Sequence, residues 1–262
     1  MVYTHNINPI IISLGSLDLY WYGAMYAFSF LIIDFLMKKD TLNGSSEFSN
    51  KTIDSLLFIS IISLLLGGRL GYVVFYDFNF YLNNLEKIFF IWEGGMSFHG
   101  GLIGVIAGSM YLSIRENINF FNLSDYIVLY IPIGLGLGRI GNFINGELYG
   151  IPTNSTWGII FPLVDNLPRH PSMLYEFFME GVLLFIILKM ISKLHMPRGI
   201  MSSAFLILYS IFRFLIEFVR VPDSQIGYLY NEWFTMGQLL SVPMFIIGFM
   251  LLYFSMRGKQ SQ

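Results

Sequence analysis

Long apolar stretches, each about as long as a membrane is thick, alternate with short polar segments along the whole chain. A transmembrane helix needs about 20 consecutive, mainly apolar residues. The pattern therefore predicts an all-α polytopic membrane protein with about seven transmembrane helices. No internal repeat is visible, so we expect a single transmembrane domain over residues 1–262. The expected spans are roughly 18–37, 53–76, 97–114, 125–143, 172–193, 200–220 and 234–256.

Two polar segments interrupt this apolar pattern. The segment from Lys38 to Lys51, which contains Asn43-Gly44-Ser45-Ser46, is expected to be a loop. The segment 145–171 is the longest between spans, and its four prolines exclude a continuous helix, because proline removes a backbone donor. We expect it to form a small cap outside the membrane, inserted between the fourth and fifth spans.

The composition agrees with a membrane protein. Hydrophobic residues make up 55% of the chain and charged residues only 12%, whereas a soluble domain has about 25% charged residues. A soluble protein with a large core is disfavoured, because so few charges cannot cover a water-facing surface. The first 17 residues contain no Lys or Arg, so the first span is expected to be retained rather than cleaved as a signal peptide.

The residue inventory excludes several kinds of chemistry. The chain has no cysteine, which rules out disulfides and cysteine nucleophiles or metal ligands. Its four histidines lack metal-binding spacing, so we expect neither a metal nor a cofactor. The net charge of −2 provides no basic field, so we expect no nucleic-acid partner.

Basic residues flank the predicted spans unequally. Nine of the fifteen Lys and Arg residues fall on one side of the membrane, and only three on the other. Because cytoplasmic loops are rich in Lys and Arg, we expect the N-terminus outside and the C-terminus in the cytoplasm. This orientation places the cap formed by segment 145–171 on the non-cytoplasmic side of the membrane. The nine residues are Lys38, Lys39, Lys51, Arg115, Lys189, Lys193, Arg198, Arg257 and Lys259.

The polar residues within the spans gather in the non-cytoplasmic half of this topology. A charge near the bilayer centre costs at least ~2.5–3.5 kcal/mol, so Arg69, Arg139 and Arg213 need an explanation. They either form internal ion pairs or bind an anionic group, and three arginines at one depth favour the second. The other polar residues at this level are Tyr22, His99, Asn142, Asn145, Glu147, Arg169, His170, Tyr175, Glu176, Glu217 and Arg220.

The sixth predicted span carries a charged stripe. Arg213, Glu217 and Arg220 are spaced to share one helix face. Arg213 and Glu217 can pair with each other, yet the stripe can also present arginine donors to a phosphate.

The fourth predicted span ends in glycines and polar residues. Gly134, Gly138 and Gly141 form a smooth stripe that predicts close helix packing. The polar residues that follow are costly at the bilayer edge unless they bind a ligand or one another. They are Asn142, Asn145 and Glu147, beside Arg139.

His99 and Tyr22 are the remaining candidates for chemistry. His99 lies between two glycine pairs that would let a substrate approach the imidazole closely, and histidine suits proton transfer near neutral pH. Tyr22 and Tyr26 lie one turn apart, either in an aromatic belt at the interface or in a site.

Six sequence segments match a known family in order and spacing: YWYG (20–23), GGRLGYVVFYDF (67–78), GGMSFHGGLIG (94–104), GRIGNFINGELYG (138–150), RHPSMLYE (169–176) and RFLIEFVRVPD (213–223). On these segments the chain resembles the bacterial phosphatidylglycerol–prolipoprotein diacylglyceryl transferases over nearly its whole length. GRIGNFINGELYG is the most specific segment. Met173 departs from the pattern, since the family more often has Gln there.

The resemblance implies an activity and a location. Such enzymes transfer the diacylglyceryl group of phosphatidylglycerol to the thiol of a lipobox cysteine in a prolipoprotein, as the first step of bacterial lipoprotein maturation. A thioether forms and glycerol 1-phosphate is released. The resemblance implies a bacterial inner-membrane protein whose partners are phosphatidylglycerol and prolipoproteins. It also implies importance for Tyr22, His99, Arg139, Asn142, Glu147, Gly150, Arg213 and Glu217.

One mechanism fits both the residues and the resemblance. Arg139 and Arg213 would hold the lipid phosphate and stabilise the charge on the leaving glycerol phosphate. The thiolate is the nucleophile, and His99 is the candidate base. Glu217 and Glu147 are alternative bases, or they orient the arginines. We expect catalytic roles for His99, Arg139, Arg213, Glu217 and Tyr22, and substrate contacts from Arg139, Asn142, Asn145, Glu147, Gly150, Arg69, Arg169 and His170.

Three other functions agree less well with the sequence. A transporter would usually carry its polar site near the membrane midplane, often with inverted repeats. An intramembrane serine protease would need a serine nucleophile, but no G-x-S-x-G segment occurs. A scaffold without chemistry would not need ionisable residues spread over several spans.

Overall fold

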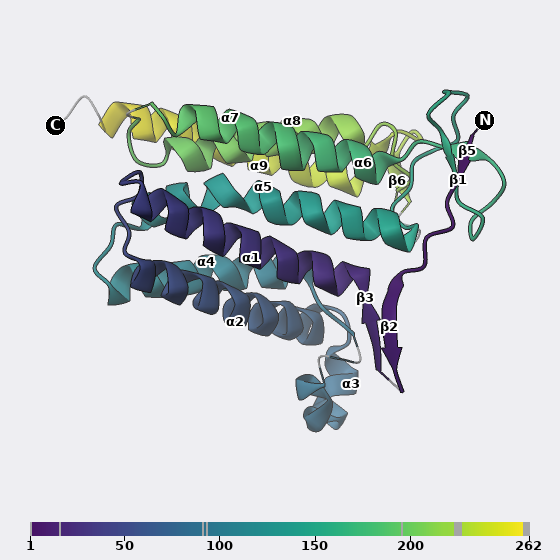
Figure 1. Ribbon diagram of the computed structural model, residues 1–262, viewed down its shortest axis with the longest axis horizontal. Coiled ribbons are helices and arrows are strands. Elements are labelled where there is room, and N and C mark those ends of the chain that lie inside the picture. The colour runs from purple at the N-terminus through teal and green to yellow at the C-terminus, as the bar shows by residue number, and fades with distance from the viewer. Residues whose placement is uncertain are drawn as a thin grey trace. The chain divides into compact units, whose positions relative to one another are not determined.

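Helices make up most of the protein in a computed structural model that describes residues 2–15, 17–90, 92, 94–194, 196–222 and 227–258 (Figure 1). Contacts divide the chain into two compact units, and each is described by itself. The first unit comprises Met1–Ile33 and Asp125–Gln262, and the second comprises Asp34–Ser124.

A helix coincides with most of each predicted span. In the first unit, the region expected to be the fifth span is one continuous helix whose middle is π-helical. The π-helical part was not predicted. The helices with residues in this unit are α1 (Trp21–Leu42), α5 (Phe120–Asn145), α6 (Ser172–Glu176), η3 (Phe177–Leu183, the π-helical part), α7 (Leu184–Ile191), α8 (Ile200–Ile216) and α9 (Met236–Gly258).

The first unit also contains short strands, which the apolar pattern did not predict, although the protein is mostly helical as expected. A two-stranded hairpin precedes α1, a second lies before α9, and a small three-stranded sheet joins the N-terminus to the segment after α5. Each strand has only two to five residues, too few to give an alternating sequence signal. The strands are β1 (Tyr3–Thr4), β2 (Ile10–Leu14), β3 (Leu17–Tyr20), β4 (Ile159–Ile160), β5 (Pro168–Arg169), β6 (Tyr228–Tyr230) and β7 (Phe234–Thr235).

The segment after α5 has a small core of its own. Parallel pairing of β1 with β4 and antiparallel pairing of β4 with β5 form its sheet. Ile159, Phe161 and Met173 are buried together, and Met173 is fully inaccessible to solvent. An apolar side chain at position 173 therefore suits this protein. As predicted, the segment 145–171 is not a continuous helix.

The second unit contains the remaining helices. The predicted loop from Lys38 to Lys51 is shorter than expected, because α1 continues to Leu42 and the next helix begins at Asn50. Ser49 caps that helix by accepting a hydrogen bond from the backbone N–H of Thr52 (3.1 Å). Besides the end of α1 and the start of α5, the helices among its described residues are α2 (Asn50–Phe75), α3 (Phe78–Asn83), η1 (Leu85–Phe89) and α4 (Phe98–Arg115).

Glycines let α2 and α4 pack with their backbones almost in contact. A Cβ atom on Gly67 would lie 2.4 Å from the carbonyl oxygen of Gly100, and one on Gly104 would lie 2.1 Å from that of Ser63. Small residues allow this approach between membrane helices, where dispersion and weak polar contacts replace the hydrophobic effect.

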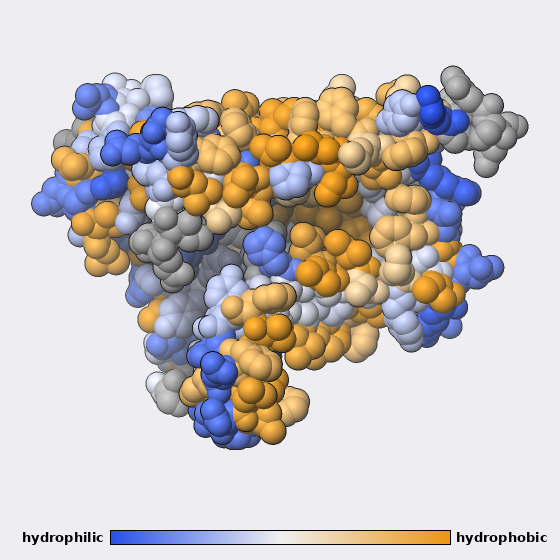
Figure 2. Space-filling model, turned by 180° about the vertical axis from the view of Figure 1, so that it is seen from behind, coloured by the Kyte–Doolittle hydropathy of each residue, from blue (hydrophilic) through white to orange (hydrophobic). Residues whose placement is uncertain are grey.

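Three of the described helices are long and apolar enough to cross a membrane: α2, α5 and α9. The helix α8 is apolar but shorter. Figure 2 shows hydrophobic residues over much of the visible surface, and large exposed side chains such as Phe35, Phe58 and Phe75 contribute to the apolar exterior. A lipid-facing surface accounts for this exposure.

Replacing Gly104 by Ala should destabilise the protein, because the new methyl group would overlap the backbone of α2. Overpacking of this kind costs ~1–3 kcal/mol, and thermal unfolding in detergent followed by tryptophan fluorescence should give a lower Tm. The control is Gly23→Ala in α1, where an added Cβ meets no described atom within 4 Å. Equal Tm values for the two variants would contradict the close α2–α4 contact.

Candidate functional site

Arg139 on α5 and Arg213 on α8 converge on one buried carboxylate in the first unit. Nε of Arg139 lies 2.7 Å from Oε2 of Glu176, and Nη1 of Arg213 donates a hydrogen bond to Oε1 of the same side chain. Glu176 is fully buried at the end of α6. Two of the intramembrane arginines expected from the sequence thus meet at one point, through a residue from a third helix.

Arg220 and Glu217 extend this cluster beyond the end of α8. Nη1 of Arg220 donates to Glu176 Oε1 (3.0 Å), and Nη2 of Arg213 lies 2.5 Å from Glu217 Oε1. Arg213 and Glu217 therefore pair with each other, which was one of the two alternatives left open by the sequence. The expected helical stripe is wrong at Arg220, because α8 ends at Ile216 and Arg220 lies in extended chain that pairs with Gly150.

The start of α9 holds Glu217 in place. Thr235 Oγ1 donates to Glu217 Oε2 (2.6 Å), while Thr235 and Gln238 cap the helix reciprocally through their side chains. A Cβ on Gly237 would lie 2.5 Å from the Glu217 carboxyl carbon. Only glycine therefore allows α9 to approach the carboxylate this closely.

Glu180 is a second acidic residue beside the two arginines. It lies one turn beyond Glu176 on the π-helical segment η3 and is fully buried. Its oxygens lie 3.7 Å from Nη2 of Arg139 and 3.9 Å from Nη1 of Arg213. Three arginines and three glutamates thus form a largely buried set whose formal charges cancel. We call it the charged cluster: Arg139, Arg213, Arg220, Glu176, Glu180 and Glu217.

Two glycines allow η3 and α5 to come close enough for these contacts. A Cβ on Gly181 would lie 2.8 Å from the Cα of Gly136, so the two backbones nearly touch. Glu180 precedes Gly181, and Arg139 lies about one turn beyond Gly136. The carboxylates and the guanidinium groups therefore face each other across a short gap.

The polar residues at the end of α5 bind one another. Nη1 of Arg139 donates to Asn142 Oδ1 (3.2 Å). The amide groups of Asn142 and Asn145 donate to Glu147 Oε1, at 2.8 Å and 3.1 Å. This chain of contacts connects the charged cluster to the segment after α5. The polar residues thus bind one another, which is one of the two arrangements expected from the sequence.

Tyr22 packs against the end of α5. Its ring covers Gly141, where an added Cβ would lie 2.8 Å from the Tyr22 ring, and its hydroxyl lies 3.2 Å from that of Tyr26. Gly138 contacts Tyr26 in the same way, and Gly134 lies near Ser29. The predicted packing role of the glycine stripe is confirmed.

Gly150 joins three backbone segments. Its N–H donates to the carbonyl of His170 (2.7 Å), and a Cβ at this position would lie 2.3 Å from the carbonyl oxygen of Val219. The chain at Gly150 also forms a bridge with Arg220. Glycine is needed at position 150 because no side chain fits between its backbone and the backbones of His170 and Val219.

The side chain of Arg169 is held in place by Asp165, Gly150 and Tyr149. Its guanidinium pairs with both oxygens of Asp165, at 2.5 Å and 3.2 Å, donates to the Gly150 carbonyl (3.2 Å) and lies over the ring of Tyr149. The arginine holds the pKa of the Asp165 carboxyl below its usual value. Burial lowers the pKa of the neighbouring His170, whose Nδ1 lies 3.1 Å from the hydroxyl of Tyr175.

Arg69 belongs to the second unit and is almost fully buried there. Its five N–H groups make five hydrogen bonds to backbone carbonyls, so none remains for a ligand. The two glycines 94 and 95 adopt positive φ angles and turn two of these carbonyls toward it. The five acceptors are Lys87, Ile88, Phe90, Gly94 and Gly95.

His99 is the second residue of α4, and its side chain is exposed. The glycine pairs on either side of it have structural tasks. Gly94 and Gly95 form the turn around Arg69, while Gly100 packs against Gly67 and Gly101 against Leu64. Local geometry alone thus accounts for these glycines.

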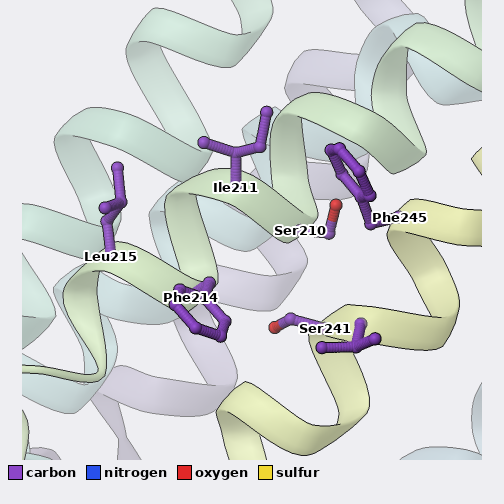
Figure 3. A pocket seen from close by; sticks show the side chains of 7 residues that line it. Ser210, Ile211, Phe214, Leu215, Ser241 and Phe245 are labelled. Carbon is purple, nitrogen blue, oxygen red and sulfur yellow. The ribbon is translucent and has the colours of Figure 1, made fainter.

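A hollow of about 240 Å³ lies between α8 and α9 (Figure 3). The hydroxyls of Ser210 and Ser241 donate to carbonyls of their own helices, at 2.8 Å and 2.7 Å. The hollow therefore offers an apolar wall and no reactive group. Its other lining residues are Ile211, Phe214, Leu215, Val242 and Phe245.

Sequence reasoning did not single out Glu180, Thr235 or Gly237. Glu176 and Glu180 are spaced one turn apart on an apolar helix, and this spacing is the signal that could have identified the pair. The contact of Thr235 and Gly237 with Glu217 is tertiary and has no local signal. Within the described ranges, no group of three or more His, Asp or Glu side chains is arranged to hold a metal ion.

Comparisons with known proteins agree on one family. A family model described as prolipoprotein diacylglyceryl transferase matches residues 9–254. The phosphatidylglycerol–prolipoprotein diacylglyceryl transferase of Aeromonas hydrophila is 47% identical over 254 residues, which cover 97% of this chain and 92% of that protein. Proteins of the same name from Nitratidesulfovibrio vulgaris and Methylococcus capsulatus are 47% and 45% identical, with 94% of each chain covered. Since both the family match and these relatives cover nearly the whole sequence, the chain belongs to the prolipoprotein diacylglyceryl transferase family.

Proposed function

We propose that this protein transfers the diacylglyceryl group of phosphatidylglycerol to the thiol of a lipobox cysteine in a prolipoprotein. The carbon–oxygen bond to the lipid phosphate breaks, a thioether forms, and glycerol 1-phosphate leaves. Family membership and the name of the relatives support this reaction. The observation that carries it in the structure is the convergence of Arg139 and Arg213 on Glu176.

We propose that the protein spans the bacterial inner membrane about seven times as one transmembrane domain. The placement of Lys and Arg supports an external N-terminus and a cytoplasmic C-terminus. Segment 145–171 would then be a periplasmic cap, on the side where exported prolipoproteins arrive.

The phosphate of the lipid would bind to Arg139 and Arg213. Their side chains are 19% and 15% exposed, so a ligand can reach them, unlike Glu176. Nη2 of Arg139 makes only the 3.7 Å contact with Glu180 among the described residues, which leaves its N–H groups available. Arginine binds phosphate oxygens in a bidentate manner and would also stabilise the charge on the leaving group.

Neutral donors and acceptors near Arg139 would orient the lipid glycerol. Asn142 contacts Arg139 directly, and Tyr22 lies on the same end of α5. Asn145 and Glu147 would hold the Asn142 amide. For the remaining residues, the contacts favour structural roles over substrate binding: Arg69, Gly150, Arg169 and His170.

The attacking group must be a thiolate, so a base has to accept the thiol proton. His99 is the proposed base because of its residue type and the family motif around it. Glu147 is the alternative. Glu217 is better suited to orient Arg213, because both of its oxygens already contact Arg213 or Thr235.

Purified protein should lipidate a lipobox peptide in detergent containing phosphatidylglycerol. The Cys peptide should gain the mass of one diacylglyceryl group and release glycerol 1-phosphate, while a Cys→Ser peptide should stay unchanged. Mass spectrometry of the peptide measures this directly. Folded protein that modifies neither peptide would refute the transfer reaction and favour transport of an anionic solute.

Arg213→Lys should keep the positive charge but lose the planar guanidinium group, whose two Nη atoms contact Glu176 and Glu217 together. We expect kcat/KM to fall ~100-fold or more, as when a preorganised donor is removed from a transition state. The matched control is Arg257→Lys, an exposed arginine over Tyr253 at the end of α9, which should stay within about twofold of wild type. Equal activities of the two variants, at equal Tm, would exclude Arg213 from the reaction.

His99→Gln should lower kcat by ~10²–10⁴-fold near neutral pH, the usual effect of a missing general base. Activity should recover as the pH rises toward ~8.5, because the peptide thiol then ionises without help. The measurement is the pH profile of kcat between pH 6 and 9. A variant profile that follows the wild-type profile would leave Glu147 as the candidate base.

A further inference from the structure

Glu180 is the least satisfied member of the charged cluster. Among the residues that the structure describes, neither of its carboxylate oxygens has a hydrogen-bond partner, although the side chain is fully buried. The nearest guanidinium nitrogens are at 3.7 Å and 3.9 Å. A buried carboxylate without donors is unfavourable in its charged form.

The other two glutamates are held much more tightly. Oε1 of Glu176 accepts hydrogen bonds from Arg213 and Arg220, and its Oε2 lies 2.7 Å from Arg139. Glu217 accepts from Thr235 and pairs with Arg213 at 2.5 Å. Glu180 is therefore the carboxylate of the charged cluster with the fewest close donors.

An anionic ligand would disturb the neutrality of the cluster. Three arginines and three ionised glutamates sum to zero, and a phosphodiester would bring one further negative charge. An uncompensated charge in a buried site is strongly unfavourable. One proton on a carboxylate would restore neutrality.

We propose that Glu180 is a positioning residue that takes up one proton when an anionic phosphodiester binds to Arg139 and Arg213. This inference rests on the proposed function. The proton comes from solvent, binds to a carboxylate oxygen of Glu180, and returns to solvent when the glycerol phosphate has left. The neutral carboxyl no longer competes for Nη2 of Arg139, which makes no other contact among the described residues and then turns to the phosphate.

The groups that face Glu180 leave it as the site of protonation. The arginines remain charged at any accessible pH, and an ordinary tyrosine is neutral below about pH 10. Glu176 and Glu217 keep their short contacts with arginine. The facing groups are Arg139 on α5, Glu176 on α6, Tyr209 and Arg213 on α8, and Arg220 beyond it.

The segment that carries Glu180 suits such a role. Insertion of a π-helical turn shifts side chains from their α-helical positions, and such turns are frequent at functional sites. Here the π-helical segment starts directly after Glu176 and brings Glu180 beside the same two arginines. Gly136 and Gly181 permit the close approach of the helices at this point.

The first test measures proton uptake by the wild-type protein. Short-chain phosphatidylglycerol is added to protein in weakly buffered detergent between pH 7 and 9, with a pH indicator dye. Uptake should approach one proton per bound lipid, and diacylglycerol, which lacks the phosphate, should cause none. Binding of phosphatidylglycerol without proton uptake at any pH in this range would overturn the proposal.

The second test compares KM for phosphatidylglycerol across the same pH range. In the wild type, KM should rise with pH by up to about tenfold per unit, because binding then requires one proton. Glu180→Gln mimics the neutral carboxyl, so its KM should stay low and flat, with a smaller change in kcat. Glu180→Asp should retain the pH dependence, and the exposed Glu86→Gln should behave like wild type.

The outcomes separate this inference from the proposed function. A Glu180→Gln protein whose KM follows the wild-type pH dependence would overturn the role of Glu180 and leave the transfer reaction intact. Failure of the wild type to form the thioether product would count against the reaction itself. Tm measurements on each variant exclude unfolding as the cause of a changed KM. Proton uptake is measured on the wild-type protein and does not depend on any variant.

Discussion

Three guanidinium groups and three carboxylates lie together in the first unit, most of them buried, and neither set would be stable there without the other. A single buried charge is strongly unfavourable in apolar surroundings, but here each arginine contacts at least one glutamate. The requirement for neutrality explains why Glu176 lies at the centre. It also means that an arginine cannot be considered as an anion site without its acidic partners.

Close helix packing is the condition for this pairing. Gly136 and Gly181 bring α5 and η3 together, and Gly237 brings the start of α9 onto Glu217. Larger residues would separate the elements and lengthen ion pairs that depend on short distances. The glycines are thus part of the site, although they have no chemistry of their own.

The segment after α5 is tied to the same cluster through its backbone. Gly150 pairs with the chain at Arg220 and donates its N–H to the His170 carbonyl, while Asn142 and Glu147 continue the polar chain from Arg139. The position of Arg220 beyond the end of α8 therefore depends on this pairing. A change in the segment after α5 can alter the charged cluster without touching an arginine.

The amino-acid sequence by itself determined the helices, the membrane character and the family, because apolar length and specific motifs are local properties. It also identified Arg139, Arg213 and Glu217, since charges within apolar runs are rare and costly. It did not reveal that Arg69 gives all its donors to backbone carbonyls, or that Glu176 and Glu180 are the partners of the arginines. Only the tertiary structure decided these points, because the same guanidinium group can bind a ligand, a carboxylate or a carbonyl, and its choice depends on which segments of the chain pack beside it.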